Sequence, residues 1–451
     1  MDVRLKGLWM SNTPWCTSGY GIQTNYLLPR FAERGIVFDI FAFYGLEGGL
    51  LKWEGFNIYP KGKDPYGNDI IGAHYTHSRA QLLITLLDVW VLNDFPRKVK
   101  RWVPWMPIDH SPVQNIVLNH IKDAWDVLPY AKFGQHELNR AGVQSTYIPH
   151  GVEPKIYKSL PNRNQYKKLL GFQESDFVVG MVAANKGNPS RKNFDGQFRA
   201  FAQFAKTHSD AMLYCHSEPT DMWSGVNLPE LIEVISKEFD FPELEQRIHF
   251  PDRYENMLGF PADFLARAYN AFDVLLMCTL GEGFGLPTIE AQACGCPVIG
   301  SDATATAELI QVGYKVQISE RVYTPLASWQ FIPQTQDIVN GLNWAYVRRE
   351  NEILRKNAAA SMTPYHWDNT VEHYWMPWFE KVIAQIHAEE PKVTPVPNIP
   401  QAPAFEARSL KAEVVDMPVP PNCTAVETTE GVVILPEGFV NENSAADSSQ
   451  E

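Results

Sequence analysis

Short apolar runs alternate along the chain with amphipathic segments, and glycine- or proline-bearing loops separate them. An uninterrupted apolar run predicts a buried strand of a parallel sheet, whereas apolar positions spaced three or four apart predict a helix that covers such a sheet. The predicted strands are residues 3–10, 37–43, 70–75, 89–93, 102–108, 126–130, 177–183, 212–216, 248–250, 274–277 and 297–299. The predicted helices are residues 22–34, 78–87, 135–141, 194–206, 229–238, 263–271, 335–360 and 366–387. This alternation indicates an α/β protein, in which residues 44–70 are expected to be irregular.

Composition and charge narrow the class of protein and its partners. At 451 residues, 45% of them hydrophobic, the chain has room for roughly two or three domains with sizeable cores. A formal net charge of -13 disfavours general binding to nucleic acid or anionic membranes, because the field repels phosphate groups. No apolar run reaches the roughly 18 residues of a membrane span, and the first residues lack the apolar core of a signal peptide. Six scattered cysteines indicate reduced thiols, so we expect a cytoplasmic location.

The most informative stretch is the loop and helix that follow the apolar strand at 274–277. Glycines surround Glu282 in the loop, Pro287 suits the first turn of a helix, and Glu290 lies about one turn inside it. A glycine loop that leads into a helix presents free backbone N–H groups and a positive dipole end to a phosphate. The two carboxylates would repel phosphate, but they suit hydrogen bonds from sugar or ribose hydroxyls. A tight turn with two solvated acids is the alternative interpretation.

The sequence Glu282-Gly-Phe-Gly-Leu-Pro-Thr-Ile-Glu290 resembles the E-x7-E signature of retaining glycosyltransferases of the GT-B fold, in particular family 4 (glycosyl transferases group 1). The resemblance includes the apolar and proline positions between the acids. It implies an α/β GT-B fold, in which two Rossmann-like domains face each other across a cleft. The N-terminal, acceptor-side domain would span residues 1–152, completed by a crossover helix at 366–388. The nucleotide-sugar-binding domain would span 153–365, and a proline-rich, disordered tail would occupy 391–451.

The resemblance also implies roles for the residues of this motif. Glu290 would hold the ribose of the nucleotide, while Glu282 and the backbone after it would hold hydroxyls of the donor sugar. The donor-binding residues of this loop would be Gly283, Phe284, Gly285 and Leu286. Residues 301–308 resemble the segment that follows the motif in the family, and Glu308 is predicted to begin the next helix.

A basic loop follows the predicted strand at 177–183 and leads into a helix. Its cations Lys186, Arg191 and Lys192 are well placed to neutralise a diphosphate, because a strand end and a helix start lie next to them. The block resembles the arginine–lysine pair of family 4, and Arg191 with Lys192 is the best-matched part. Family members commonly have an arginine nearer the strand, where this chain has Asn185 or Lys186. A solvated basic loop is the alternative interpretation.

Two loops of the first half are candidates for the other wall of the cleft. Gly19 and Gly21, after the first strand, are similar to the first glycine loop of GT-B enzymes, although a simple turn explains them nearly as well. The G-x-G-x-x-G fingerprint is missing there, which disfavours NAD binding.

Asp109 and His110 end another apolar strand, where residues of parallel sheets line the ligand crevice. Family 4 enzymes often have a cleft histidine in this region, so His110 is the match, with Asp109 as a rival and a structural role as the alternative.

These residues predict a hexosyltransferase that moves a sugar from UDP- or GDP-hexose to an acceptor hydroxyl with retention of configuration. The predicted catalytic residues are Glu282, His110, Arg191 and Lys192. The acceptor could be a glycan, a lipid, a protein or a small molecule. No D-x-D triplet is present, so we expect neither a metal ion nor another cofactor. His150, which closes the first predicted domain, is predicted to be a hinge residue. A nucleotide-sugar epimerase or phosphorylase on the same fold, or a non-catalytic sugar-nucleotide-binding scaffold, is the alternative function.

Overall fold

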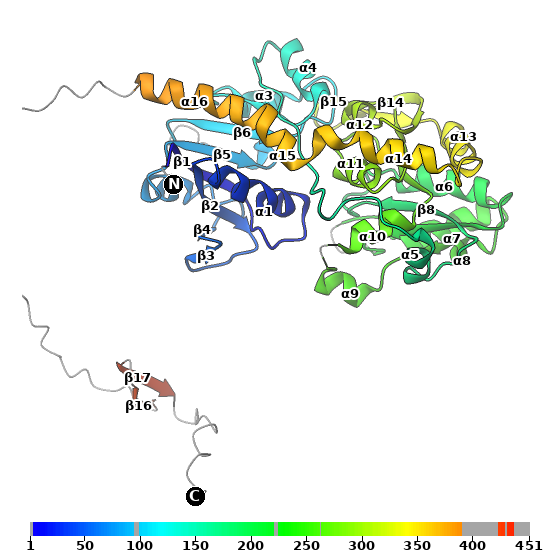
Figure 1. The fold of residues 1–451 in the computed structure, drawn as a ribbon, viewed down its shortest axis with the longest axis horizontal. Helices are drawn as coiled ribbons and strands as arrows, with labels where there is room; N and C mark the ends of the chain where they lie inside the picture. The colour runs from blue at the N-terminus through cyan, green and yellow to red at the C-terminus, as the bar shows by residue number, and fades with distance from the viewer. Residues whose placement is uncertain are drawn as a thin grey trace, which may run out of the picture. The chain divides into compact units, whose positions relative to one another are not determined.

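The computed structural model describes residues 3–93, 99–220, 224–261 and 263–389, together with two strands near the C-terminus. The contacts divide the chain into a compact unit, Met1–Glu390, and a second unit, Pro391–Glu451. The first unit contains two sheets of mostly parallel strands with helices packed around them (Figure 1). The predicted α/β architecture with parallel sheets is confirmed.

The first sheet has the strand order β3-β4-β2-β1-β5-β6-β7, and each neighbouring pair except β3–β4 is parallel. Its strands are β1 (Leu5–Asn12), β2 (Ile36–Tyr44), β3 (Leu51–Trp53), β4 (Phe56–Pro60), β5 (Leu82–Leu86), β6 (Trp102–Met106) and β7 (Leu128–Pro129). Its helices are α1 (Gly19–Ala32), α2 (Ile71–His77), α3 (Asn115–Ile121) and α4 (Lys132–Arg140). Because parallel strands share one carboxyl edge, the loops after β1, β5 and β6 gather at the same edge of the sheet.

The second sheet has the order β10-β9-β8-β11-β12-β13 and is parallel throughout. Its strands are β8 (Phe177–Val182), β9 (Ala211–His216), β10 (Ile248–His249), β11 (Val274–Met277), β12 (Val298–Ser301) and β13 (Gly313–Val316). A separate hairpin joins β14 (Ile318–Thr324) to β15 (Ser328–Pro333). The helices are α5 (Arg163–Leu169), α6 (Phe194–Ala205), α7 (Leu228–Glu238), α8 (Leu244–Arg247), α9 (Arg253–Leu258), α10 (Phe264–Ala271), α11 (Leu286–Ala293), α12 (Thr304–Leu309), α13 (Thr335–Tyr346) and α14 (Glu352–Ser361).

The helical segment after α14 returns to the first sheet (Figure 1). It consists of α15 (Trp367–Thr370), a π-helical turn (Val371–Trp375) and α16 (Met376–Glu389). The rings of Phe379 and Phe31 lie 4.9 Å apart, and the indole of Trp378 donates to Asp126 at 2.8 Å. The aromatic side chains Trp367, Trp375, Trp378 and Phe379 of this segment are buried and belong to the core.

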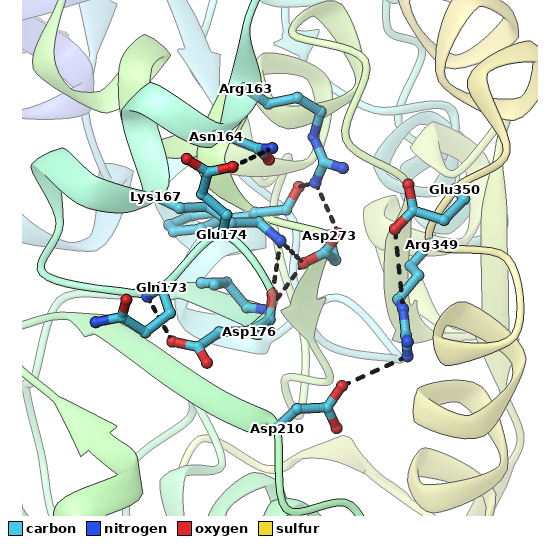
Figure 2. Close-up of polar contacts among 12 residues, drawn as sticks. Arg163, Asn164, Lys167, Gln173, Glu174, Asp176, Asp210, Asp273, Arg349 and Glu350 are labelled. Carbon is cyan, nitrogen blue, oxygen red and sulfur yellow. Dashed lines mark hydrogen bonds and ion pairs between the residues drawn. The ribbon is translucent and has the colours of Figure 1, made fainter.

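A buried carboxylate anchors the helix that precedes the second sheet (Figure 2). Asp273 accepts a hydrogen bond from the backbone N–H of Val178 at 2.8 Å and pairs with Arg163 at 2.7 Å and Lys167 at 2.9 Å. Burial acts to raise the pKa of Asp273, but the two cations outweigh burial and lower it. Because both cations lie on α5, this pairing holds α5 against the sheet.

Part of the first sheet differs from the sequence-based prediction. A strand at 70–75 and a helix at 78–87 were expected, but the structure has α2 followed by β5, and a 3-10 turn (Val89–Val91) replaces the next predicted strand. β5 is buried throughout between β1 and β6, and periodicity alone does not distinguish so short an apolar run from a buried helix. The segment at 44–70, expected to be irregular, contains β3 and β4.

Two helix boundaries in the second half also need correction. The single helix predicted at 335–360 is two helices, because Asn351 starts α14 by accepting a hydrogen bond from the N–H of Leu354 at 3.0 Å. Glu308, predicted to begin a helix, lies near the end of α12. Its carboxylate instead accepts hydrogen bonds from the N–H groups of Lys132 and Phe133, at 2.9 and 3.0 Å, and so caps α4 of the first sheet.

In the second unit, β16 (Cys423–Thr428) and β17 (Gly431–Pro436) form an antiparallel pair. This pair includes the apolar segment at 432–435. The rest of the tail predicted to be disordered, 391–451, lies outside the described residues.

Candidate active site

The candidate site lies where loops at the carboxyl ends of β6, β8 and β11 approach one another. A Cβ atom on Gly281 would overlap the carbonyl oxygen of Asp109, and one on Gly283 would overlap Pro107. Glycine at these two positions therefore allows the loop after β11 to come close to the loop after β6.

Two amide side chains fix the basic loop beside the end of β11. Asn193 donates from Nδ2 to the carbonyl of Cys278 at 2.9 Å. Gln197, on α6, accepts from the N–H of Cys278 at 2.9 Å and donates to the carbonyl of Lys192 at 2.7 Å. These bonds place the two cations of the basic loop next to the acidic motif.

Glu282 is paired with both of those cations. Lys192 Nζ lies 2.7 Å from Oε1, and Arg191 Nη1 lies 3.0 Å from Oε2. The Arg191 guanidinium also donates to the carbonyl of Gly281. Glu282 is only 5% exposed, and burial acts to raise its pKa, but Arg191 and Lys192 together lower it below its usual value. Burial lowers the pKa of Lys192, and Glu282 opposes that effect.

The opposite wall is formed by Asp109 and His110. His110 Nδ1 lies 2.5 Å from Asp109 Oδ1, while Asp109 Oδ2 lies 3.6 Å from Nε of Arg191. Burial acts to raise the pKa of Asp109, but His110 and Arg191 lower it. Because Asp109 engages Nδ1, a ligand would meet the other ring nitrogen of His110, Nε2. The structure thus brings His110, Arg191, Lys192 and Glu282 into one charged cluster, with Asp109 as the partner of His110.

Asp88, a further carboxylate beside this cluster, was not identified from the sequence. Burial raises its pKa to about 6, with a further contribution from Asp109 and opposition from Arg191. Burial raises the pKa values of Tyr20 and Tyr130, and the nearby charge of Asp88 raises both of them further. An aspartate directly after an apolar run was the available signal, but the helix predicted at 78–87 concealed the end of β5.

Glu290 lies in a different environment, among tyrosines. Its Oε2 accepts a hydrogen bond from the hydroxyl of Tyr269 at 2.9 Å, and the residue is 6% exposed. Burial raises the pKa of Glu290 to about 7, although hydrogen bonds from Tyr269 and Tyr157 act to lower it. The sequence analysis assigned neither tyrosine to the site: Tyr269 lies in α10, before the motif, and Tyr157 lies before the second sheet.

The two glycines of the first loop have different surroundings. Ser18 caps α1 by accepting from the N–H of Gly21 at 3.2 Å, and a Cβ atom on Gly21 would overlap the backbone of Cys16. A Cβ atom on Gly19 would instead lie 3.2 Å from Leu286, in the acidic motif. The turn itself requires Gly21, whereas Gly19 faces the predicted donor-binding loop.

The donor-binding loop presents its backbone more than its side chains. Phe284 is buried, with its ring 5.0 Å from that of His150, and burial lowers the pKa of His150 well below its usual value. Gly285, at φ +94°, makes the turn that starts α11. A ligand would therefore meet main-chain groups at 283–286 rather than the Phe284 ring.

Asn185 lies in the region where the sequence left a third contact to the donor open. The Asn185 amide donates to the carbonyls of Glu218, Thr220 and Val226 at 3.0, 3.2 and 2.7 Å. Its oxygen accepts from the N–H of Val226 at 2.9 Å, so the whole amide is engaged within the protein. Lys186 lies exposed on the same loop.

Within the described ranges, no group of three or more His, Cys, Asp or Glu side chains is arranged to hold a metal ion. None of the helices in those ranges combines the length and the hydropathy needed to cross a membrane.

The described cysteines are free thiols: Cys16, Cys215, Cys278, Cys294 and Cys296.

Residues 178–324 match the family model described as "Glycosyl transferases group 1", and this span contains the basic loop and both carboxylates. The D-inositol 3-phosphate glycosyltransferase of Mycobacterium marinum is 30% identical over 108 residues, 24% of this chain and 22% of that protein. An uncharacterized glycosyltransferase of Sulfolobus islandicus rod-shaped virus 1 is 26% identical over 198 residues, 42% of this chain and 52% of that protein. The match thus spans about a fifth of the mycobacterial relative and about half of the viral one.

Solved structures resemble the chain over most of its length. Sucrose-phosphate synthase from Thermosynechococcus elongatus has a TM-score of 0.65 at 17% identity, covering 84% of this chain and 100% of that one. HepE from Anabaena, in complex with UDP, has a TM-score of 0.59 at 15% identity, covering 83% and 100%. At such identities the likeness shows the fold alone. The chain therefore has the GT-B fold, with a match to glycosyl transferases group 1 over residues 178–324.

Proposed function

We propose that the chain is a glycosyltransferase that moves a hexose from a nucleoside-diphosphate sugar to an acceptor hydroxyl. The observation that carries this proposal is a cluster of charged side chains. Arg191, Lys192 and Glu282 come from loops of the second sheet, and they lie opposite Asp109 and His110 from a loop of the first sheet. The GT-B fold and the match over residues 178–324 support it.

The two cations suit a diphosphate leaving group. During transfer the bond between the anomeric carbon and a phosphate oxygen breaks, and negative charge develops on the diphosphate. Donors already in place lower the barrier, because their interaction strengthens as that charge develops. Arg191 and Lys192 lie directly before α6, whose free N–H groups and dipole also favour an anion. We assign both side chains to the diphosphate.

The remaining predicted residues fit the other parts of the donor. Glu282 and His110 are assigned to hydroxyls of the donor sugar, and Glu290 to those of the ribose. The main chain at 283–286 and Lys186 complete the donor site on the second sheet. Because Glu282 and His110 belong to different sheets, a ligand held between them would be shielded from water at the reacting bond.

We propose that transfer retains the anomeric configuration, in the manner of family 4. Neither Glu282 nor Asp109 offers the free carboxylate that a double displacement needs as its nucleophile, because cations engage both oxygens of Glu282 and Asp109 faces His110 and Arg191. This supports attack by the acceptor oxygen on the face from which the phosphate leaves. The departing phosphate oxygen takes the acceptor proton. Proton NMR of the first-formed product distinguishes this from inversion.

UDP-hexose and GDP-hexose are the proposed donors, and the UDP held by HepE favours UDP. Metal independence, the absence of another cofactor and a cytoplasmic location remain part of the proposal. The acceptor class is left open.

Calorimetry against UDP-, GDP- and ADP-sugars tests the proposal, followed by turnover of the sugars that bind. We expect at least one nucleotide sugar to bind and to release its nucleoside diphosphate when an acceptor is supplied. Conversion of the donor to another nucleotide sugar without an acceptor would indicate an epimerase. Binding without any turnover would indicate a scaffold. Folded protein that binds none of the panel would contradict the proposal.

A further inference from the structure

The hairpin formed by β14 and β15 touches both walls of the candidate site. On the side of the second sheet, the N–H of Phe331 donates to the carbonyl of Leu280 at 2.8 Å. The N–H of Leu280 donates in turn to the carbonyl of Arg191 at 2.9 Å. Main-chain hydrogen bonds thus join β15 to the acidic motif and to the basic loop.

On the side of the first sheet, β15 pairs with the residue after His110. Trp329 donates its N–H to the carbonyl of Ser111 at 2.9 Å, and Ser111 donates back to the carbonyl of Trp329 at 3.2 Å. The hydroxyl of Ser328, which is fully buried, donates to the carbonyl of Pro112 at 2.5 Å. These three bonds fasten the His110 loop to the same strand that is fastened to Arg191.

We propose that β15 positions His110 opposite Arg191 and Glu282, and that the backbone of Trp329 makes the decisive link. The inference rests on the proposed transfer function, because it assigns β15 to the geometry of that reaction. His110 and Glu282 belong to different sheets, so contacts between the two sheets fix their separation, and β15 adds main-chain bonds to the direct contact between the loops after β6 and β11. A misplacement of about 1 Å can cost on the order of 100-fold in rate. A main-chain path from one wall to the other resists such a shift.

The side chain of Trp329 is not part of this link. It is 38% exposed and lies against other hairpin residues, 5.1 Å from the ring of Tyr323 and 6.0 Å from the Arg321 guanidinium. The N–H groups of Trp329 and Phe331 both point off the hairpin, and the alternation of an antiparallel ladder leaves Gln330 to pair with β14. A proline at 329 would therefore remove the bond donated to the carbonyl of Ser111, and so weaken the pairing with Ser111, without interrupting the β14–β15 ladder.

The experiment compares Trp329→Pro with Trp329→Ala in the full chain. Alanine removes the same side chain but keeps the N–H, so it is the matched control. In Trp329→Pro we expect faster amide exchange at Ser111 and a kcat lowered roughly tenfold to a hundredfold. Affinity for the donor sugar should stay within about twofold of wild type, because the proposed donor contacts to Arg191, Lys192 and Glu290 lie in the second sheet. Trp329→Ala should resemble wild type in all three measurements.

The two arms separate the possible failures. Unchanged exchange at Ser111 in Trp329→Pro would overturn the link itself, and this arm needs no substrate. Faster exchange with wild-type kcat would overturn the positioning of His110. Equal losses in the alanine and proline variants would show that the side chain, not the backbone, matters. Failure of the proposed function would appear already in wild type, as a protein that turns over no nucleotide sugar.

Discussion

Glu282 and Glu290 lie eight positions apart in one motif, yet the fold gives them opposite electrostatic environments. Both are almost fully buried. Two cations lower the pKa of Glu282, so this carboxylate stays charged. Hydrogen bonds from tyrosine hydroxyls offset the burial of Glu290 only in part, and its pKa rises to about 7. Similar burial therefore goes with a lowered pKa at one position and a pKa of about 7 at the other.

The difference is instructive because burial alone does not decide the charge of a carboxyl group. A neighbouring opposite charge favours ionisation, while neutral hydrogen-bond donors compensate only in part. In the proposed reaction, Glu282 accepts hydrogen bonds from the donor sugar and also pairs with the two cations assigned to the departing diphosphate. Glu290 is suited to uniform binding of a neutral ribose. These different roles of Glu282 and Glu290 can be tested by substitution.

Replacing the cationic side chains of Arg191 and Lys192 should have the largest effect, a loss of affinity for the donor. Arg191→Ala with Lys192→Ala removes charge-assisted hydrogen bonds worth roughly 1.5–3 kcal/mol each, so donor affinity should fall more than tenfold. The same pair in a Glu282→Gln background avoids leaving a buried, unpaired carboxylate. Lys237→Ala, an exposed lysine on α7, is the control. Titration calorimetry with UDP and GDP measures the loss, and unchanged affinity would refute the assignment.

Kinetics of single variants should separate the two carboxylates. Glu282→Ala and His110→Ala should lower kcat by about tenfold to a hundredfold, because their contacts to the donor sugar strengthen in the transition state. Glu290→Ala should raise the donor KM as well, since a ribose contact is made before and during the reaction. Steady-state rates over a range of donor concentrations give both constants. A His110→Ala enzyme with near-native kcat would remove His110 from the site.

The stability of the protein should depend on pH through Glu290. Its folded pKa of about 7 lies above the usual value, so the folded state holds the proton more tightly than the unfolded state. Stability from this proton is complete below about pH 4.5 and is lost as the pH rises to about 7. Glu290→Gln should therefore gain up to about 3 kcal/mol over wild type at pH 8 and little at pH 4.5.

Urea unfolding of both proteins at several pH values measures this gain. Glu350→Gln, on the exposed surface, serves as the control. A constant difference between wild type and Glu290→Gln across the range would show that Glu290 does not titrate there.

Chelation should have the smallest effect. If the carboxylates pair with cations and hydroxyls rather than with a metal, EDTA should change turnover by less than about twofold. Activity abolished by EDTA and restored by manganese or magnesium would assign a different role to Glu282.

The sequence was most informative where local chemistry demands particular residues. The glycines around Glu282, the proline at the start of α11 and the cations before α6 are typical of a phosphate-binding loop, and the family resemblance favoured that interpretation over a tight turn. Apolar runs located most strands of both sheets for the same reason, since strands buried on two faces have few polar positions. The strand β5 was missed because a short buried run has no period to read.

Only the tertiary structure decided which distant residues share an environment. Asp88 joins the cluster because β5 ends next to β6, and Tyr157 and Tyr269 reach Glu290 from segments outside the motif. No local pattern records such neighbours, since pKa values depend on burial and on charges brought together by folding. The link from β15 to Ser111 is likewise a main-chain contact, made by N–H and carbonyl groups that every residue other than proline carries. Side-chain identity located the loops of this site, whereas backbone geometry decided how the two walls are joined.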